Sequence, residues 1–164
     1  MKKVIDILRE KVTDGFVKAG YDEKYGMISV SNRPDLCQYQ CNGAMAAAKE
    51  YKKAPFQIAG EVVEQLSSEA VFAQIEAVNP GFINITVSGE FLAEQAERMN
   101  VEERFGVALP EKQKTIVIDY GGANVAKPLH VGHLRPAIIG ESVKRICRFM
   151  GDNVIGDVHL GDWG

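Results

Sequence analysis

Residues 115–135 have the sequence TIVIDYGGANVAKPLHVGHLR, in which a short apolar run precedes a glycine-rich stretch with two histidines. Thr115–Asp119 is rich in β-branched residues and apolar on both faces, which is typical of a buried parallel strand. Downstream, five apolar residues recur at the spacing of one helix face: Ile139, Val143, Ile146, Cys147 and Met150. Gly151 can end this helix and Val154-Ile155 can begin a second strand. Residues 115–164 thus predict the first strand-helix-strand unit of a Rossmann-like nucleotide-binding domain.

The first 110 residues have a different pattern, in which helical spacing alternates with short extended runs. Spacing and capping residues, with Asn42 suited to cap the second helix, predict helices over residues 4–20, 42–53, 55–66 and 90–104. Strands are predicted over residues 27–30, 71–78 and 82–88, with Asn79-Pro80-Gly81 joining the last two as a hairpin. We therefore expect an α+β domain with a small antiparallel sheet over residues 1–110, and an α/β chain overall.

Composition limits the kinds of protein that the chain can be. Of its 164 residues, 46% are hydrophobic and 25% charged, and the formal net charge is −3 without a block of Lys or Arg. A broad basic face for nucleic acid is therefore not indicated. No apolar segment reaches the roughly 18 residues of a membrane span, and the N-terminus lacks a signal-peptide core, so we expect a cytoplasmic protein. An odd count of cysteines predicts reduced thiols with a packing role: Cys37, Cys41 and Cys147.

The glycine-rich connection between the predicted strand and helix carries the residue types of an active site. In open parallel sheets, ligands bind outside the carboxyl ends of the strands, where this loop would lie. Gly121, Gly122 and Gly132 let the backbone approach a ligand, and free amides at the helix start favour a phosphate. His130 and His133 can share one side of the helix entrance and donate N–H groups to a triphosphate. Histidines that only cap the helix are the alternative.

The tetrapeptide His130-Val-Gly-His133 resembles the signature of class I aminoacyl-tRNA synthetases, which bind ATP and transfer its adenylyl group. Four further motifs extend the resemblance to arginyl-tRNA synthetases: Asn124-Val-Ala-Lys127, Leu134-Arg135, Ile138-Ile-Gly140 and Gly161-Asp-Trp-Gly164. Upstream, residues 38–49 and Pro80-Gly-Phe-Ile-Asn84 resemble the family's N-terminal additional domain, which contacts the elbow side of tRNA. The resemblance implies an arginine–tRNA ligase that activates arginine with ATP and Mg²⁺, binds no metal of its own, and transfers arginine to tRNA(Arg).

The same resemblance implies a tRNA-binding additional domain over residues 1–110 and the truncated start of the catalytic domain over residues 115–164. The family's second signature, Lys-Met-Ser-Lys-Ser, and its anticodon-binding domain have no counterpart in these 164 residues. We therefore expect the chain alone to be inactive. The open edge of its last strand would be available for self-association.

Roles for single residues follow from the resemblance. His130 and His133 would contact the ATP phosphates and stabilise charge during adenylation, and Lys127 would add a positive charge. Gly132 and Asp162 would complete the ATP site.

Arginine would be bound by a second set of residues. Asp119 is similar to an acidic position that pairs with the guanidinium group, and a loop-capping role is its alternative. Asn124 would hold the α-amino end of arginine, and Gly122 and His159 would also contact the substrate, with local packing as the alternative for His159. The tRNA D-loop would be contacted by Gln40 and Asn42.

Departures from the family pattern are concentrated beside the histidines. Gly121-Gly-Ala123 replaces a Ser-Ser-Pro or Ser-Gly-Pro stretch, and Pro136-Ala137 replaces Ser-Thr, so contacts there must come from backbone or water. Pro136 also places the first helical turn at or just before itself. Two other functions fit parts of the pattern: a non-catalytic tRNA- or protein-binding module, and a metal hydrolase that uses the three histidines or Asp162.

Overall fold

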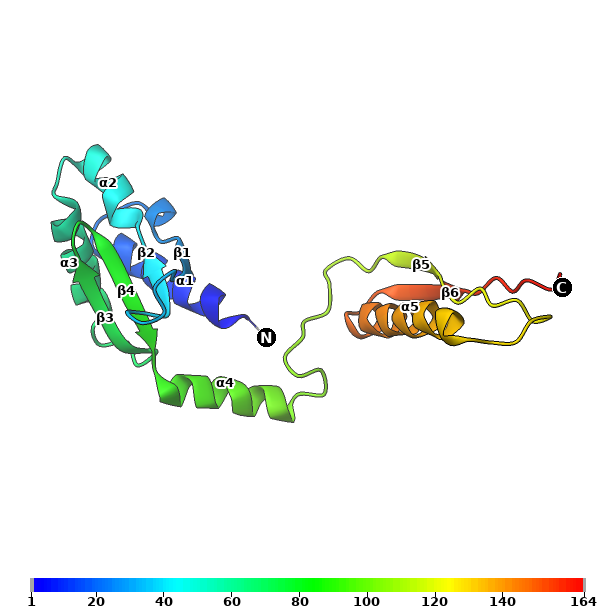
Figure 1. The fold of residues 1–164 in the computed structure, drawn as a ribbon. Helices are drawn as coiled ribbons and strands as arrows, with labels where there is room; N and C mark the ends of the chain where they lie inside the picture. Colours follow the sequence, from blue (N-terminus) through cyan, green and yellow to red (C-terminus); the bar gives the residue numbers. More distant parts are fainter. Residues whose placement is uncertain (1, 164) are drawn as a thin grey trace. The chain divides into compact units, whose positions relative to one another are not determined.

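The structure is a computed structural model that describes residues 2–163. The chain divides into two compact units, Met1–Glu103 (unit 1) and Arg104–Gly164 (unit 2) (Figure 1). The last residue of the Gly161-Asp-Trp-Gly164 motif lies outside the described residues. No helix within residues 2–163 is long and apolar enough to cross a membrane.

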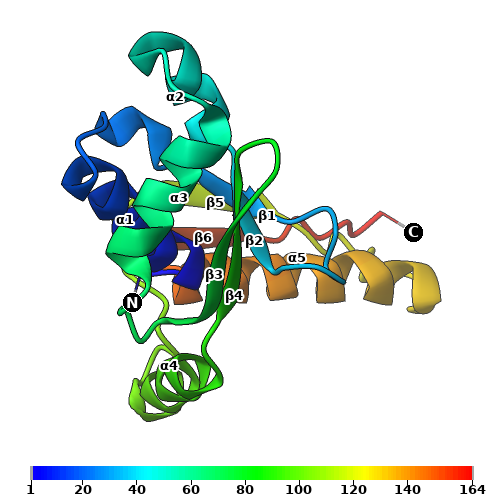
Figure 2. The same cartoon turned by 90° about the vertical axis from the view of Figure 1, so that its left-hand side faces the viewer.

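Unit 1 contains a four-stranded antiparallel sheet in the order β1-β2-β4-β3 (Figure 2). Its strands are β1 (Ile28–Val30), β2 (Tyr39–Cys41), β3 (Phe72–Val78) and β4 (Phe82–Val87). The predicted β3–β4 hairpin is confirmed, and it places Asn84 opposite Glu76. The sequence pattern did not predict β2.

The helices of unit 1 build one apolar core. They are α1 (Val4–Lys18), α2 (Gly43–Tyr51), α3 (Pro55–Leu66) and α4 (Gly89–Val101), with a short 3-10 turn, η1 (Glu23–Tyr25). The predicted stripe of α1 is buried at Leu8, Val12 and Phe16, and it packs in one cluster with side chains of α3 and the sheet. Pro55 begins α3, as its missing N–H allows.

The predicted cap of α2 is only partly correct. Asn42 occupies the N-cap position, but its side chain makes no capping hydrogen bond. A cap that was not predicted forms on α4, where the hydroxyl of Ser88 accepts a hydrogen bond from the Phe91 amide at 3.2 Å. Asn42 therefore leaves its exposed side chain free for another role.

The cysteines are free thiols, as predicted, and they differ in burial. Cys41 is fully buried between α2 and η1, where its Sγ lies 3.4 Å from both the Tyr25 carbonyl and the Gly43 amide. Burial raises the pKa of the Cys41 thiol to about 11, although the Gly43 amide opposes the shift. Cys147, on the helix of unit 2, is half-buried.

We expect Cys147 to react first with a thiol reagent at pH 8. With a pKa of about 11, only about 0.1% of Cys41 is thiolate at that pH, roughly 200-fold less than for an ordinary cysteine. Mass spectrometry after brief alkylation with iodoacetamide would locate the label, and the Cys147→Ser variant should lose the fast phase. Labelling of Cys41 at the rate of Cys147 would contradict this prediction.

Unit 2 contains the predicted strand-helix-strand unit: β5 (Thr115–Asp119), α5 (Val131–Phe149) and β6 (Asn153–Asp157). The two strands are parallel and run in register from Thr115 opposite Asn153 to Asp119 opposite Asp157. Pro136 is the sixth residue of α5, so the first turn precedes it as predicted.

Two expectations about burial in unit 2 were wrong. Val117 of β5 is 64% exposed, because α5 covers only one face of the two strands. The predicted apolar stripe of α5 is also largely exposed, with Ile139 at 55% and Ile146 at 60%. The helix instead buries Gly140, on which Tyr120 packs. Periodicity located the helix but not the face that the strands contact.

Candidate functional site

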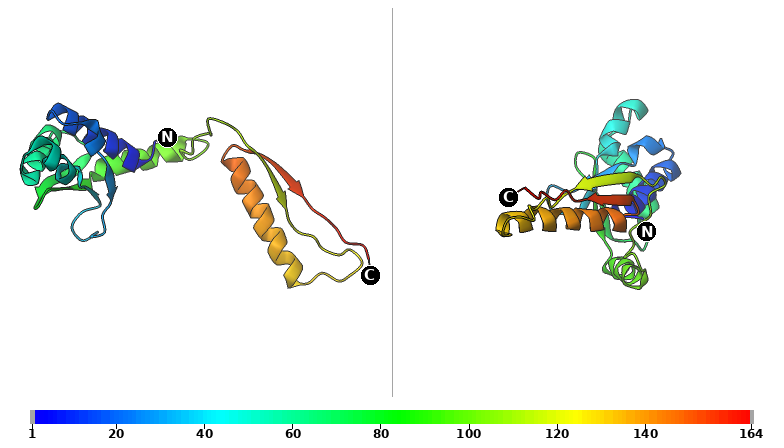
Figure 3. Two further views of the ribbon diagram at one scale, coloured as in Figure 1. Left: turned by 90° about the horizontal axis from the view of Figure 1, so that it is seen from above. Right: turned by 90° about the vertical axis from the view of Figure 1, so that its right-hand side faces the viewer.

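The loop between β5 and α5 and the segment after β6 lie at the same end of unit 2, beyond the carboxyl ends of both strands (Figure 3). Backbone hydrogen bonds join the two segments. The Gly161 amide donates to the Ala123 carbonyl at 3.1 Å, and the Val125 amide donates to the Gly161 carbonyl at 2.7 Å. The ligand-binding edge of a parallel sheet is therefore built from two tied segments.

The N-terminus of α5 is capped by its two histidines. His130 is the N-cap residue, and its Nδ1 accepts a hydrogen bond from the Gly132 amide at 3.1 Å. Nδ1 of His133 in turn accepts from the His130 amide at 3.2 Å, which completes a capping box. The imidazole rings lie 4.0 Å apart between centroids.

This cap fixes which nitrogen carries the proton. A ring nitrogen that accepts a hydrogen bond has no proton, so each neutral imidazole carries its proton on Nε2. His130 and His133 thus present two Nε2–H donors at the positive end of a 19-residue helix. The capping alternative and the ligand-binding prediction are compatible, because capping uses Nδ1 and leaves Nε2 for a ligand.

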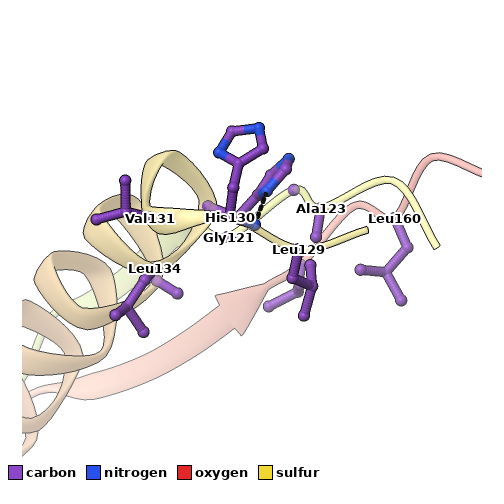
Figure 4. A pocket seen from close by; sticks show the side chains of 11 residues that line it. Gly121, Ala123, Leu129, His130, Val131, Leu134 and Leu160 are labelled. Carbon is purple, nitrogen blue, oxygen red and sulfur yellow. Dashed lines mark hydrogen bonds between the residues drawn. The ribbon is translucent and has the colours of Figure 1, made fainter. Parts of the chain in front are cut away.

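A cavity of 620 Å³ opens beside the histidines (Figure 4). One wall is formed by the loop residues 121–123, another by the first two turns of α5, and a third by Val158 and Leu160. Leu129, Val131, Leu134 and Ala137 give it a mainly apolar lining, with the histidines as its ionisable groups. Such a cavity suits a flat apolar ring system with charged groups at its rim.

Two lining glycines explain one departure from the family pattern. Gly121 and Gly122 have φ values of 91° and 74°, a left-handed conformation in which other residues are strained. A serine at either of these two positions would be strained in this backbone. The loop therefore exposes main-chain groups, rather than hydroxyl groups, to the cavity.

The predicted site residues are not all brought together. Gly122, His130 and His133 line the cavity, with Gly132 beside them, whereas Lys127 and Asp162 are exposed and outside its lining.

Asn124 is engaged within the loop region. Its Nδ2 donates to the Trp163 carbonyl at 2.7 Å, and its Oδ1 accepts from the Ala126 amide at 2.9 Å. In this structure the side chain thus ties the loop to the segment after β6.

An acidic pair lies at the strand ends next to this region. Asp119 and Asp157 are directly paired in the parallel register, and Nδ1 of His159 lies 3.6 Å from Oδ2 of Asp157 and 4.0 Å from Oδ1 of Asp119. All three side chains are more than half exposed. Asp157 was not predicted as a site residue. Its place at the end of the second predicted strand could have indicated it. Its alignment with Asp119, however, follows only from the register of β5 and β6.

A second polar group lies in unit 1. Nε2 of Gln40 donates to Oδ1 of Asn84 at 2.8 Å, and the two residues are direct partners across β2 and β4. Asn84 is 6% exposed, so its buried side chain fixes the orientation of the Gln40 amide. The sequence indicated Gln40 and the exposed Asn42 as RNA contacts, and it contained Asn84 only as part of a motif. The pairing of Asn84 with Gln40 was missed, because it depends on the unpredicted strand β2.

The part of the chain that the structure describes has no group of three His, Cys, Asp or Glu residues arranged to hold a metal ion. The histidines of the metal-hydrolase alternative are divided between two places. His130 and His133 stack on each other at the helix start, whereas His159 lies beside the acidic pair.

Known families match both units. The model described as "Arginyl tRNA synthetase N terminal domain" matches residues 2–87, and "tRNA synthetases class I (R), catalytic domain" matches residues 95–164. The arginine–tRNA ligase of Agathobacter rectalis is 62% identical over 165 residues, and that of Alkaliphilus oremlandii is 59% identical over 164 residues. Both matches cover 100% of this chain and 28% of the relative, so the chain spans about a quarter of their length.

Solved structures share the fold. The arginyl-tRNA synthetase of Plasmodium falciparum has a TM-score of 0.65 at 24% identity, covering 100% of this chain and 32% of that one. The enzyme of Thermus thermophilus has a TM-score of 0.52 at 20% identity, covering 96% and 25%. Since the N-terminal-domain model alone matches more than half of the residues, the chain belongs to the arginyl-tRNA synthetase family.

Proposed function

We propose that this chain is the N-terminal part of an arginine–tRNA ligase that acts in the cytoplasm, activates arginine with ATP and charges tRNA(Arg). The observation that carries the proposal is the pair of Nε2–H donors at the start of α5, beside a glycine-rich loop at the carboxyl ends of parallel strands. Residues 115–164 would supply the first part of the catalytic domain. Residues 1–110 would supply the tRNA-binding domain.

ATP, as its Mg²⁺ complex, would place its phosphates at the helix start. The helix dipole favours an anion there, and both imidazoles can donate to phosphate oxygens through Nε2. The apolar cavity of 620 Å³ would take the adenine ring, and the exposed Lys127 would approach the phosphates. Gly132 has no side chain to obstruct them, and Asp162 would face the nucleotide from the opposite segment.

Activation joins arginine to the adenylyl group. A carboxylate oxygen of arginine attacks the α-phosphorus of ATP, the bond from that phosphorus to the bridging oxygen breaks, and pyrophosphate leaves with the electron pair. Negative charge shifts toward the leaving phosphates during this step. Donors that are already held in place, as the capping box holds His130 and His133, stabilise that charge without reorganising.

The arginine side chain would bind at the strand ends. Asp119 and Asp157 provide two carboxylates for one guanidinium group, which favours paired acceptors. His159 lies close enough to both to occupy their oxygens until arginine replaces it. Asn124 would direct its remaining acceptor capacity to the α-amino group, and Gly122 would leave room for the substrate backbone.

Transfer RNA would contact the polar group on the sheet of unit 1. Asn84 holds the Gln40 amide in one orientation. Asn42 follows directly after β2, and its exposed side chain makes no capping hydrogen bond to α2. Oriented amides recognise unstacked bases of an RNA loop by hydrogen bonding. Self-association through the open edge of the last strand, β6, stays a prediction, which sedimentation analysis would test.

Two assays test the proposal. Arginine-dependent exchange of pyrophosphate into ATP, by a ligase that carries these 164 residues as its N-terminal part, should require arginine and not accept lysine. In a gel shift of the chain with tRNA(Arg), the Kd should rise about tenfold on Gln40→Ala, since loss of one oriented contact costs about 1.4 kcal/mol. Pyrophosphate exchange without arginine would contradict the arginine-activating function. Equal affinity of the Gln40→Ala and wild-type chains for tRNA(Arg) would contradict the tRNA contact at Gln40.

A further inference from the structure

Tyr120, the first residue after β5, connects the strand to the helix through a polar cluster that has no direct contact with the cavity. Its backbone amide donates to the Asp157 carbonyl of β6 at 3.0 Å. Its hydroxyl donates to Oε2 of Glu141 at 2.6 Å and accepts from Nζ of Lys144 at 2.7 Å. Glu141 and Lys144 are themselves paired at 2.5 Å on the same face of α5.

Two glycines make room for the tyrosine ring. A Cβ atom on Gly140 of α5 would lie 2.1 Å from Cβ of Tyr120, and one on Gly156 of β6 would lie 3.1 Å from its Cε1. The ring is therefore held between helix and strand with little space for movement. Gly140 belongs to the Ile138-Ile-Gly140 motif, whose residues do not line the nucleotide cavity.

The cluster keeps its charges. Lys144 first, then Tyr120 and Arg145, lower the pKa of Glu141 to about 2, so its carboxylate accepts these hydrogen bonds throughout the neutral range. The apolar residues of α5 are mostly exposed and contribute little to holding it on the strands. The contacts of Tyr120 thus account for much of the specific attachment between β5 and α5.

We propose that Tyr120, fastened by Glu141 and Lys144, is a positioning residue that sets the distance between the two walls of the nucleotide cavity. One wall, residues 121–123, follows Tyr120 directly in the chain. The other wall begins at His130 on the helix to which the Tyr120 side chain is bound. Gly140 lies seven residues from His133, about 10 Å along the helix axis, so a small rotation at the tyrosine moves the histidines relative to the loop.

This inference rests on the proposed function, because the cavity matters only if it binds a nucleotide. Preorganised donors lose much of their effect when their position varies by an ångström. Loosening the tyrosine should therefore weaken phosphate binding while the chain remains folded. Arg145 provides a matched control, since it binds Oε1 of Glu141 at 2.8 Å from an exposed position and does not touch Tyr120.

The test compares Tyr120→Phe with Arg145→Ala in the 164-residue chain. Phenylalanine keeps the ring and removes the hydroxyl. We therefore expect hydrogen exchange to rise about tenfold at the Val125 and Gly161 amides, whose hydrogen bonds join the loop to the segment after β6, and the Kd for MgATP to rise five- to tenfold. Circular dichroism at the working temperature should match the wild type. Arg145→Ala should change both quantities less than twofold. If Tyr120→Phe does not fold, Glu141→Gln provides the same comparison.

The outcomes separate this inference from the proposed function. Faster exchange at Val125 and Gly161 in Tyr120→Phe, without any MgATP binding by the wild-type chain, would support the attachment but contradict the nucleotide site, and with it the positioning role. MgATP binding by the wild type that Tyr120→Phe leaves unchanged would overturn the positioning role alone. Equal effects of Tyr120→Phe and Arg145→Ala would also overturn it, because they would reflect the general stability of α5.

Discussion

Replacing His133 with alanine should lower arginine-dependent pyrophosphate exchange by about 10²- to 10³-fold in a ligase that carries these residues. Loss of one preorganised donor to the transition state has an effect of this size. His133 supplies such a donor through Nε2, while its Nδ1 holds the His130 amide at 3.2 Å. The rate of exchange at saturating ATP and arginine is the quantity to measure.

A second substitution separates the two roles of this histidine. Asparagine at position 133 can still accept the His130 amide but has no group in the place of Nε2–H, so His133→Asn should be as slow as His133→Ala. Cys147→Ala, on the same helix and outside the cavity lining, should keep the wild-type rate. Near-normal exchange by His133→Asn would mean that His133 only caps the helix.

Gly43→Ala should destabilise unit 1 by about 3 kcal/mol, the upper part of the range for forcing an atom into a packed core. Gly43 is buried at the start of α2, and a Cβ there would lie 1.8 Å from the Tyr25 carbonyl oxygen. Neither the helix nor η1 can move without disturbing Cys41, whose thiol lies between them. Urea unfolding followed by circular dichroism would measure the loss.

Gly60→Ala is the matched control for this prediction. Gly60 lies inside α3, and a Cβ there would meet nothing within 4 Å. Because alanine is the better helix former, this variant should gain about 0.5–1 kcal/mol. A Gly43→Ala variant as stable as Gly60→Ala would show that the contact between α2 and η1 is not tightly packed.

The sequence was sufficient to predict the elements that have a strong local signal. The β-branched run at 115–119, the stripe of α1 and the Asn79-Pro80-Gly81 turn each correspond to an observed element. The order of strand, glycine-rich loop and helix also placed both histidines at a helix start. These features depend on neighbouring residues in the chain, which a pattern can represent.

Features that depend on pairing between distant segments were not predictable. Strand β2 is three residues long, and without it the Gln40–Asn84 hydrogen bond has no basis in the pattern. The pairing of Asp119 with Asp157 comes from the strand register. The attachment of Tyr120 to Glu141 and Lys144 depends on which face of α5 contacts the strands. The apolar stripe predicted a different face, and that face is largely exposed.

The most direct measurement of nucleotide binding is a titration of the 164-residue chain with MgATP, followed by the imidazole nitrogen resonances of all three histidines. Donation from Nε2 to phosphate should shift the Nε2 resonances of His130 and His133 with one common Kd, together with the Gly132 amide. His159 should shift less, and adenosine should leave the helix-start resonances in place. If MgATP leaves both Nε2 resonances unchanged, or moves only His159, the triphosphate does not bind at the start of α5.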